Sequence, residues 1–318
     1  MRLLFAGTPA VAVPALRALV ESEHEVVAVL TRADARKGRG RQLFPSDVKQ
    51  AALEFGIPVI TDRPRSEGFV EQLEALDVEC AAVVAYGEIL PVDVLDVPTH
   101  GWINLHFSVL PAWRGAAPVQ RAIMAGDEVT GASTFRIEQG LDTGPVYGMM
   151  TETIRRTDTS GDLLGRLSES GAHLLVGTMD ALAQGAINPV PQGVEGISLA
   201  PKLTSVDACV QWRHPKHIVD RVIRGCTPEP GAWTTLPGGT RLGVGPLSNV
   251  ARGVEVPEDL TPGELRFTKK NVFVGTGSGT VTLGNVTPVG KKTMNAADWV
   301  RGARLEQGII LGTENEGK

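Results

Sequence analysis

In the first half of the chain, continuous apolar runs alternate with segments whose apolar residues recur at helical spacing. Short apolar runs, typical of strands buried on both faces, lie at Leu3–Ala6, Val26–Leu30, Ala81–Ala85 and Trp102–Leu105. Amphipathic helical patterns separate them, at Pro14–Val20, Asp47–Phe55 and Glu67–Ala75. This order predicts right-handed βαβ units and therefore an α/β fold with a doubly wound, Rossmann-like, mostly parallel sheet.

The pattern breaks at the proline-rich stretch Ile187–Gly193, and residues 188–204 read as a linker. Beyond it the spacing predicts one helix over Pro215–Arg224 and a second over Asn295–Arg304. Strand patterns lie between the two helices, at Ala232–Leu236, Arg241–Val244, Asn271–Val274 and Thr280–Val286. We therefore expect a first domain at 1–187, a linker at 188–204 and a small β-barrel domain at 205–318.

Two polar side chains interrupt the last apolar run of the first domain. If Trp102–His106 is a strand, Asn104 and His106 point to one face, and Ile103 and Leu105 point to the other. An amide and an imidazole at the carboxyl end of a strand can stabilise negative charge that develops on a carbonyl oxygen. Asp142, in a turn between glycines, could orient the imidazole. Taken singly, a histidine at a strand end is more often structural, and such an aspartate is usually a turn residue.

The joint pattern closely resembles the folate-dependent formyltransferases, over nearly the whole chain. Asn104 and His106 lie in the stretch Asn-Leu-His-Phe-Ser-Val-Leu-Pro, which ends at Pro111, and Asp142 lies in Gly-Leu-Asp-Thr-Gly-Pro. The other matching motifs are Phe5–Pro9, Val83–Gly87, Trp113–Pro118, Ala200–Leu203, Pro228–Trp233 and Pro288–Met294. The motifs near the C-terminus are similar to those of the family members that act on tRNA, and the resemblance makes the second domain OB-like and tRNA-contacting.

The resemblance implies a reaction as well as a fold. The donor is 10-formyltetrahydrofolate, and the acceptor is the α-amino group of methionine carried by initiator tRNA. The amine attacks the formyl carbon directly, and Asn104 and protonated His106 hold the resulting oxyanion. Asp142 is expected to keep His106 charged, because a nearby carboxylate raises the pKa of an imidazole.

The same resemblance places the folate beside two loops. One is formed by Ser108, Val109, Leu110 and Pro111, and the other runs from Val84 to Ile89, with Val84, Tyr86, Gly87 and Ile89 as its contacts. Arg114 follows the first loop, and two roles for it stay open: it contacts the folate or a phosphate, or it clamps a local carbonyl group.

The charge distribution bears on the tRNA partner. The net charge of the chain is −5, yet residues 205–318 carry 14 Lys and Arg against 11 Asp and Glu, a net of +3. In the acidic remainder, Arg32–Arg41 holds five cations and one anion with two glycines. Such a run is often only a solvated loop, but the resemblance matches it to an insertion that reaches the acceptor stem. The expected tRNA contacts are Arg36, Lys37, Arg39 and Arg41.

Composition excludes several other classes. Three cysteines at distant positions form no disulfide framework, and the spacing of Cys209, His214, His217 and Cys226 matches no common zinc pattern, so we expect no metal. No apolar run approaches the ~18 residues of a membrane span. We expect a cytoplasmic monomer that has no contact with a membrane.

Three alternative functions use the same residues differently. A formyltransferase that acts on an amino sugar nucleotide shares the triplet of Asn104, His106 and Asp142, but needs neither the basic loop nor a tRNA-type barrel. A hydrolase would release formate from the folate with activated water. A non-catalytic tRNA-binding module would leave the triplet idle.

Overall fold

The computed structural model describes residues 1–37, 42–250 and 253–312, and the chain divides into two compact units. Unit 1 comprises Met1–Pro118, Val129–Thr153 and Leu164–Pro201. Unit 2 comprises Lys202–Lys318 together with two segments from earlier in the sequence, Val119–Glu128 and Ile154–Leu163. The second unit is therefore assembled from three separate stretches of chain.

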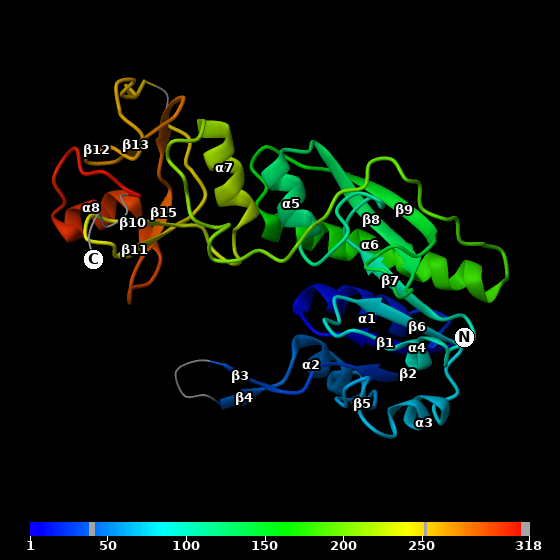
Figure 1. Ribbon diagram of the computed structural model, residues 1–318. Helices are drawn as coiled ribbons and strands as arrows, with labels where there is room; N and C mark the ends of the chain where they lie inside the picture. Colours follow the sequence, from blue (N-terminus) through cyan, green and yellow to red (C-terminus); the bar gives the residue numbers. More distant parts are fainter. Residues whose placement is uncertain (38–41, 251–252, 313–318) are drawn as a thin grey trace. The chain divides into compact units, whose positions relative to one another are not determined.

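A seven-stranded sheet forms the centre of unit 1, with the strand order β5-β2-β1-β6-β7-β8-β9 (Figure 1). Neighbouring strands from β5 to β7 are parallel, and β8 and β9 are antiparallel additions. The strands are β1 (Arg2–Gly7), β2 (Glu25–Leu30), β5 (Val59–Ile60), β6 (Cys80–Val84), β7 (Trp102–His106), β8 (Val129–Arg136) and β9 (Val146–Thr153). This arrangement confirms the predicted mostly parallel α/β sheet.

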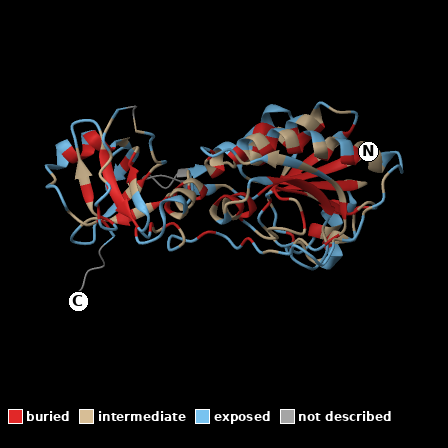
Figure 2. Cartoon of the chain, turned by 90° about the horizontal axis from the view of Figure 1, so that it is seen from above, coloured by how far each residue is buried: buried red, intermediate tan, exposed pale blue. Residues whose placement is uncertain are grey.

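Helices cover both faces of the sheet, and its strands are the buried centre of the unit (Figure 2). The helices along the first part of the chain are η1 (Ala10–Ala12), α1 (Val13–Val20), α2 (Asp47–Glu54), α3 (Phe69–Glu74) and α4 (Val92–Leu95). Side chains of α3 and α4 share a core cluster with Trp102 of β7, whose indole nitrogen donates to the carbonyl of Val94. The long helix α6 (Ser160–Ala183) packs on the other face of β7, where a Cβ added to Gly171 would lie 3.2 Å from the side chain of Leu105.

The basic segment forms two short antiparallel strands, β3 (Ala35–Lys37) and β4 (Gln42–Phe44). The sequence predicts a loop over Arg32–Arg41, so that expectation is wrong for Ala35–Lys37. Lys49 of α2 donates to Asp34 over 2.7 Å, and Ser46 caps α2 by accepting from the Lys49 main-chain nitrogen. These contacts fix the base of the pair. Arg39 and Arg41 lie outside the described residues.

Unit 2 consists mainly of antiparallel strands. Its sheets have the orders β10-β11-β15-β16 and β12-β13-β14. The elements are α5 (Pro118–Ala125), α7 (Lys216–Gly225), β10 (Trp233–Thr235), β11 (Arg241–Val244), β12 (Leu265–Phe267), β13 (Val272–Thr276), β14 (Gly279–Thr282), β15 (Asn285–Pro288), β16 (Met294–Asn295) and α8 (Ala296–Ala303). The predicted C-terminal β domain is confirmed.

One predicted strand of unit 2 is wrong. The run Thr280–Val286 is divided between β14 and β15, which belong to different sheets. The chain passes from one sheet to the other at Gly284, where an added Cβ would lie 2.4 Å from the carbonyl oxygen of Pro246. A glycine is required there because the backbones approach so closely.

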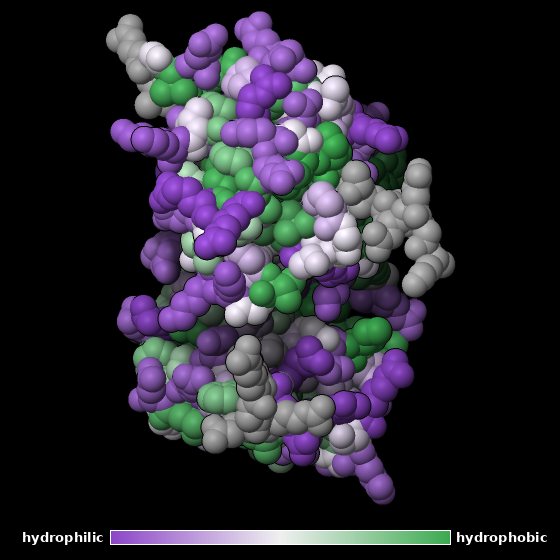
Figure 3. All heavy atoms as spheres, turned by 90° about the vertical axis from the view of Figure 1, so that its left-hand side faces the viewer, coloured by the Kyte–Doolittle hydropathy of each residue, from purple (hydrophilic) through white to green (hydrophobic). Residues whose placement is uncertain are grey.

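The described residues of unit 2 expose few large hydrophobic side chains strongly. In Figure 3 apolar side chains lie among hydrophilic ones, and the strongly exposed large hydrophobic residues among the described part of unit 2 are Val206 and Val289. Within the described ranges, no helix is long and apolar enough to cross a bilayer. The same ranges contain no group of three or more His, Cys, Asp or Glu side chains placed to hold a metal ion.

Candidate active site

Asn104 and His106 end β7 on the face that the strand pattern predicts. Ile103 and Leu105 are fully buried, with Leu105 against α6, while Asn104 is only half-buried. The strand lies between parallel β6 and antiparallel β8, where Val83 and Phe135 pair with Asn104. The two polar side chains therefore lie at the carboxyl edge of the sheet, where open α/β folds bind their ligands.

The side-chain amide of Asn104 is unused. No described residue forms a hydrogen bond with it, although the residue is half-buried in a rigid strand. A polar group in such a position lowers its free energy when it finds a partner. The amide is therefore ready to donate to a ligand atom.

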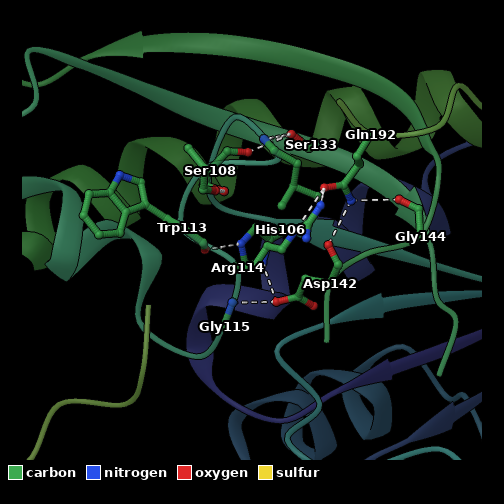
Figure 4. A network of polar contacts seen from close by, with 11 residues as sticks. His106, Ser108, Trp113, Arg114, Gly115, Ser133, Asp142, Gly144 and Gln192 are labelled. Atoms are coloured by element: carbon green, nitrogen blue, oxygen red, sulfur yellow. Dashed lines mark hydrogen bonds and ion pairs between the residues drawn. The ribbon is translucent and has the colours of Figure 1, made fainter. Parts of the chain in front are cut away.

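His106 has both ring nitrogens directed at oxygen atoms (Figure 4). Nε2 lies 2.9 Å from the main-chain oxygen of Trp113, and Nδ1 lies 3.8 Å from Oδ2 of Asp142. A carbonyl oxygen only accepts, so the proton of the neutral ring is on Nε2 and Nδ1 is the atom that titrates. Protonation of Nδ1 would place a new positive charge opposite Asp142.

Burial lowers the pKa of His106 from its ordinary value. The side chain is 6% exposed, and the cost of burying a charge outweighs the nearby Asp142 carboxylate and the Trp113 carbonyl, both of which raise the pKa. The prediction that Asp142 keeps His106 charged is therefore wrong for this structure. The neutral imidazole keeps its N–H at Nε2, where it donates to the Trp113 carbonyl.

Asp142 combines a hydrogen-bonded carboxylate with a left-handed main-chain conformation. Its carboxylate oxygen Oδ2 accepts from the main-chain nitrogen of Gly115 over 2.7 Å. Its φ of +51° lies in the left-handed region, as do those of Trp113, at +58°, and of Ala85 directly after β6, at +49°. Strained backbone of this kind gathers at functional sites, where the surrounding structure maintains it.

The loop from Ser108 to Pro111 is fixed by a residue that the sequence analysis missed. Ser133 of β8 is fully buried; its hydroxyl donates to the main-chain oxygen of Ser108 over 2.7 Å and accepts from the Leu110 nitrogen over 3.1 Å. Ser133 pairs with His106 across the two strands. A buried polar residue in an otherwise apolar strand is the signal that could have identified it.

The two predicted folate loops meet at the same edge of the sheet, because β6 and β7 are parallel neighbours. Their residues differ in burial. Val84 and Leu110 are core side chains that can offer only their backbones to a ligand, and Ile89 is 76% exposed. Tyr86 is buried, and its main-chain oxygen accepts from the Thr8 hydroxyl over 2.8 Å. Gly87 follows with a φ of +85°.

Residues 188–201, most of the linker expected at 188–204, hydrogen-bond to the loop that follows Pro111 and to the turn of Asp142. Ser198 accepts from the Trp113 nitrogen through its hydroxyl and from the Arg114 nitrogen through its carbonyl. The carbonyl of Ala200 accepts from Ala117 and lies so close to Gly115 that an added Cβ would be 2.6 Å away. This segment therefore holds the loop that carries Trp113 and Arg114.

Arg114 acts locally in this structure. Its Nε and Nη2 atoms donate to Oε1 of Gln192 over 3.1 and 2.7 Å.

Of the predicted tRNA contacts, Arg36 is exposed on β3 and Lys37 ends that strand. The structure thus groups Asn104, His106 and Asp142 with the two loops predicted to bind the folate.

Comparisons with known proteins agree with this geometry. A family model described as Formyl transferase matches residues 1–179, and one described as Formyl transferase, C-terminal domain, matches residues 202–304. A methionyl-tRNA formyltransferase from Mycolicibacterium vanbaalenii is 58% identical over 309 residues, which cover 96% of this chain and 98% of the relative. One from Streptomyces coelicolor is 57% identical over 316 residues, 98% of this chain and 100% of that one.

Solved structures share the fold at low sequence identity. HypX from Aquifex aeolicus in complex with tetrahydrofolic acid has a TM-score of 0.66 at 19% identity, and the match covers 94% of this chain and 47% of HypX. An N-formyltransferase from Helicobacter canadensis, in complex with folinic acid and dTDP-3-aminofucose, has a TM-score of 0.60 at 16% identity over 88% of this chain and 97% of that one.

Proposed function

The chain belongs to the formyl transferase family, and we propose that it transfers the formyl group of 10-formyltetrahydrofolate to the α-amino group of methionine on initiator tRNA. Relatives that carry the name methionyl-tRNA formyltransferase support this substrate pair, because they match at 55–58% identity over nearly the full length of the chain. The match extends through the C-terminal domain, residues 202–304.

The unpaired amide of Asn104 beside His106 is the observation that carries the mechanism. The methionyl nitrogen attacks the formyl carbon, and the electrons of the carbonyl double bond move to its oxygen. The Asn104 amide and the Nε2–H of His106 donate to this oxyanion, for which the imidazole leaves the Trp113 carbonyl. The bond from carbon to N10 then breaks; the amine has lost one proton and N10 has gained one.

Asp142 serves the histidine in this scheme. Negative charge on the oxyanion favours protonation of His106, and the proton enters at Nδ1, opposite Oδ2 of Asp142. The Asp142 carboxylate therefore stabilises His106 at the stage of the reaction when the ring becomes positively charged. A lost oxyanion donor typically reduces the rate about 10²-fold.

The folate and tRNA contacts complete the proposal. Ser108 to Pro111 and Val84 to Ile89 bind the folate, largely through their backbones, at the carboxyl edge of the sheet. The segment with Arg36, Lys37, Arg39 and Arg41, and the domain at 205–318, contact the tRNA, because cations bind its phosphates with release of counterions. We also propose that the chain acts as a monomer in the cytoplasm, which light scattering and cell fractionation would test.

One assay tests this function against its alternatives. The purified protein is incubated with 10-formyltetrahydrofolate and one acceptor at a time: methionyl initiator tRNA, methionyl elongator tRNA, a dTDP-linked amino sugar, or water alone. Release of tetrahydrofolate and the formylated product are measured together. We expect rapid formylation of the initiator tRNA only. Faster formylation of the amino sugar, formate release without transfer, or no reaction would each contradict the proposal.

A further inference from the structure

The side chain of Gln192 makes four hydrogen bonds within the candidate site (Figure 4). Its amide nitrogen Nε2 donates to the main-chain oxygens of Asp142 and Gly144, each over 2.8 Å. Its amide oxygen Oε1 accepts from Nε and Nη2 of Arg114. Gln192 therefore joins the turn that carries Asp142 to the loop that carries Arg114.

Chemistry fixes the orientation of this amide. Main-chain oxygens only accept and guanidinium nitrogens only donate, so the nitrogen must face Asp142 and Gly144, and the oxygen must face Arg114. Both amide protons and the oxygen are engaged at once. A side chain held in this way has one available conformation, which makes it a rigid connection between the two loops.

The turn that Gln192 holds needs external support. Asp142 lies in the left-handed region, and two residues later Gly144 passes so close to the Arg136 carbonyl that an added Cβ would be 1.8 Å from its oxygen. From this strained backbone the Asp142 side chain reaches the main-chain nitrogen of Gly115 and Nδ1 of His106. The two hydrogen bonds that Gln192 donates to the turn fix the main-chain position from which this side chain extends.

The bonds to Arg114 have a second effect. Nε and Nη2 form the edge of the guanidinium that binds a carboxylate with two parallel hydrogen bonds. Gln192 occupies that edge with a neutral oxygen, and no described carboxylate forms an ion pair with Arg114. The nearby Asp142 therefore keeps its contacts with Gly115 and His106.

We infer that Gln192 is a positioning residue for formyl transfer, which holds the Asp142 turn and keeps Arg114 from drawing the Asp142 carboxylate away from His106. This inference rests on the proposed function. It predicts that loss of the Gln192 amide acts on the chemical step through Asp142, and only weakly on the binding of either substrate.

The test compares Gln192→Ala with the matched control Gln184→Ala, an exposed glutamine just after α6. We expect kcat for Gln192→Ala to fall about 10- to 100-fold, since small displacements of catalytic groups have effects of that size. KM for both substrates should change less than about threefold. The control should match the wild-type protein.

Two further measurements separate positioning from support of the fold. In an Asp142→Asn background, Gln192→Ala should lower kcat by less than about threefold more, because the pathway through Asp142 is already lost. The pKa of His106, followed by NMR, should fall in Gln192→Ala as its carboxylate moves away. Gln192→Glu, which keeps the acceptor for Arg114 but loses both donors to the turn, should also lower kcat and provides a second variant if the alanine protein does not fold.

An unchanged kcat in Gln192→Ala, or a full multiplicative loss on top of Asp142→Asn, would overturn the inference. A wild-type protein that does not formylate methionyl initiator tRNA would instead overturn the proposed function, so the two failures are distinguishable.

Discussion

The Nε2 atom of His106 and the main-chain oxygen of Trp113 lie 2.9 Å apart, and this hydrogen bond determines which ring nitrogen of the histidine titrates. With Nε2 protonated in the neutral ring, the exchangeable site is Nδ1, opposite Asp142. The neutral ring consequently carries an N–H at Nε2, which can serve the oxyanion once it leaves the Trp113 carbonyl.

NMR of ring-labelled protein should show a neutral His106 with its proton on Nε2 and a pKa below 6.5, because burial disfavours the charged form. Asp142→Asn should lower this pKa further, since it removes the carboxylate that partly offsets burial. A pKa above 6.5, or a proton on Nδ1 in the neutral form, would contradict this assignment.

The same shift makes stability depend on pH. The unfolded chain takes up a proton on this histidine near its ordinary pKa of 6.5, and the folded protein does so only at lower pH. The contribution of His106 is thus fully present above about pH 6.5 and is lost as the pH falls toward the folded pKa. Urea unfolding at pH 7.5 and 5.5 should show a smaller pH effect in His106→Ala than in the wild-type protein. Equal pH effects would contradict the low folded pKa.

Asn104→Ala should lower kcat about 10²-fold, as expected for one lost oxyanion donor. The amide has no partner among the described residues, so the free energy of unfolding should change by less than about 1 kcal/mol. Folate affinity, measured by calorimetry, should persist. Loss of folate binding with retained turnover would assign Asn104 to binding instead.

Ser133→Ala should weaken folate binding, because the hydroxyl makes two hydrogen bonds to the loop from Ser108 to Pro111. Removal of a buried hydroxyl with unsatisfied partners costs about 1–3 kcal/mol of stability. The matched control is Ser168→Ala on α6, where a buried hydroxyl donates to the carbonyl of Gly165. Both variants should lose stability, but only Ser133→Ala should raise the dissociation constant of the folate. Equal folate affinities would leave Ser133 a structural residue.

Replacement of Arg36, Lys37, Arg39 and Arg41 with alanine should weaken tRNA binding and flatten its dependence on salt, since each lost phosphate contact reduces the slope by about one. The control is the pair Arg63→Ala and Arg65→Ala, two exposed cations elsewhere on unit 1. Folate binding should be unchanged in both proteins. An unaltered affinity and salt slope would mean that the segment is only a solvated surface loop.

Strong local patterns made much of the fold predictable. The apolar runs that became β1, β2, β6 and β7 are buried on both faces, so composition and period agree there. Strand β8 gave a weaker signal because Thr130, Ser133 and Thr134 are buried polar residues within it. The pair of β3 and β4 was missed because the sequence around it is dominated by charge and glycine.

The part of the candidate site whose residues lie in short, recognisable stretches of sequence was predictable. Asn104 and His106 share a strand face by simple alternation, and the flanking glycines marked Asp142. Gln192 was not predictable, because it lies 50 residues from Asp142 in a segment without periodicity, and its role exists only through tertiary contacts. The pKa of His106 was misjudged because burial is not visible in the local sequence.

The single-turnover rate of formyl transfer to methionyl initiator tRNA, measured for His106→Ala, Asp142→Asn and the double variant, tests the account most directly. We predict that each single change lowers the rate about 100-fold or more, that the double variant is little slower than either, and that all three still bind the folate. In Asp142→Asn the acid limb of the pH–rate profile should also shift. A near-normal rate in either single variant, or fully multiplicative losses in the double variant, would contradict a joint role of His106 and Asp142 at the oxyanion.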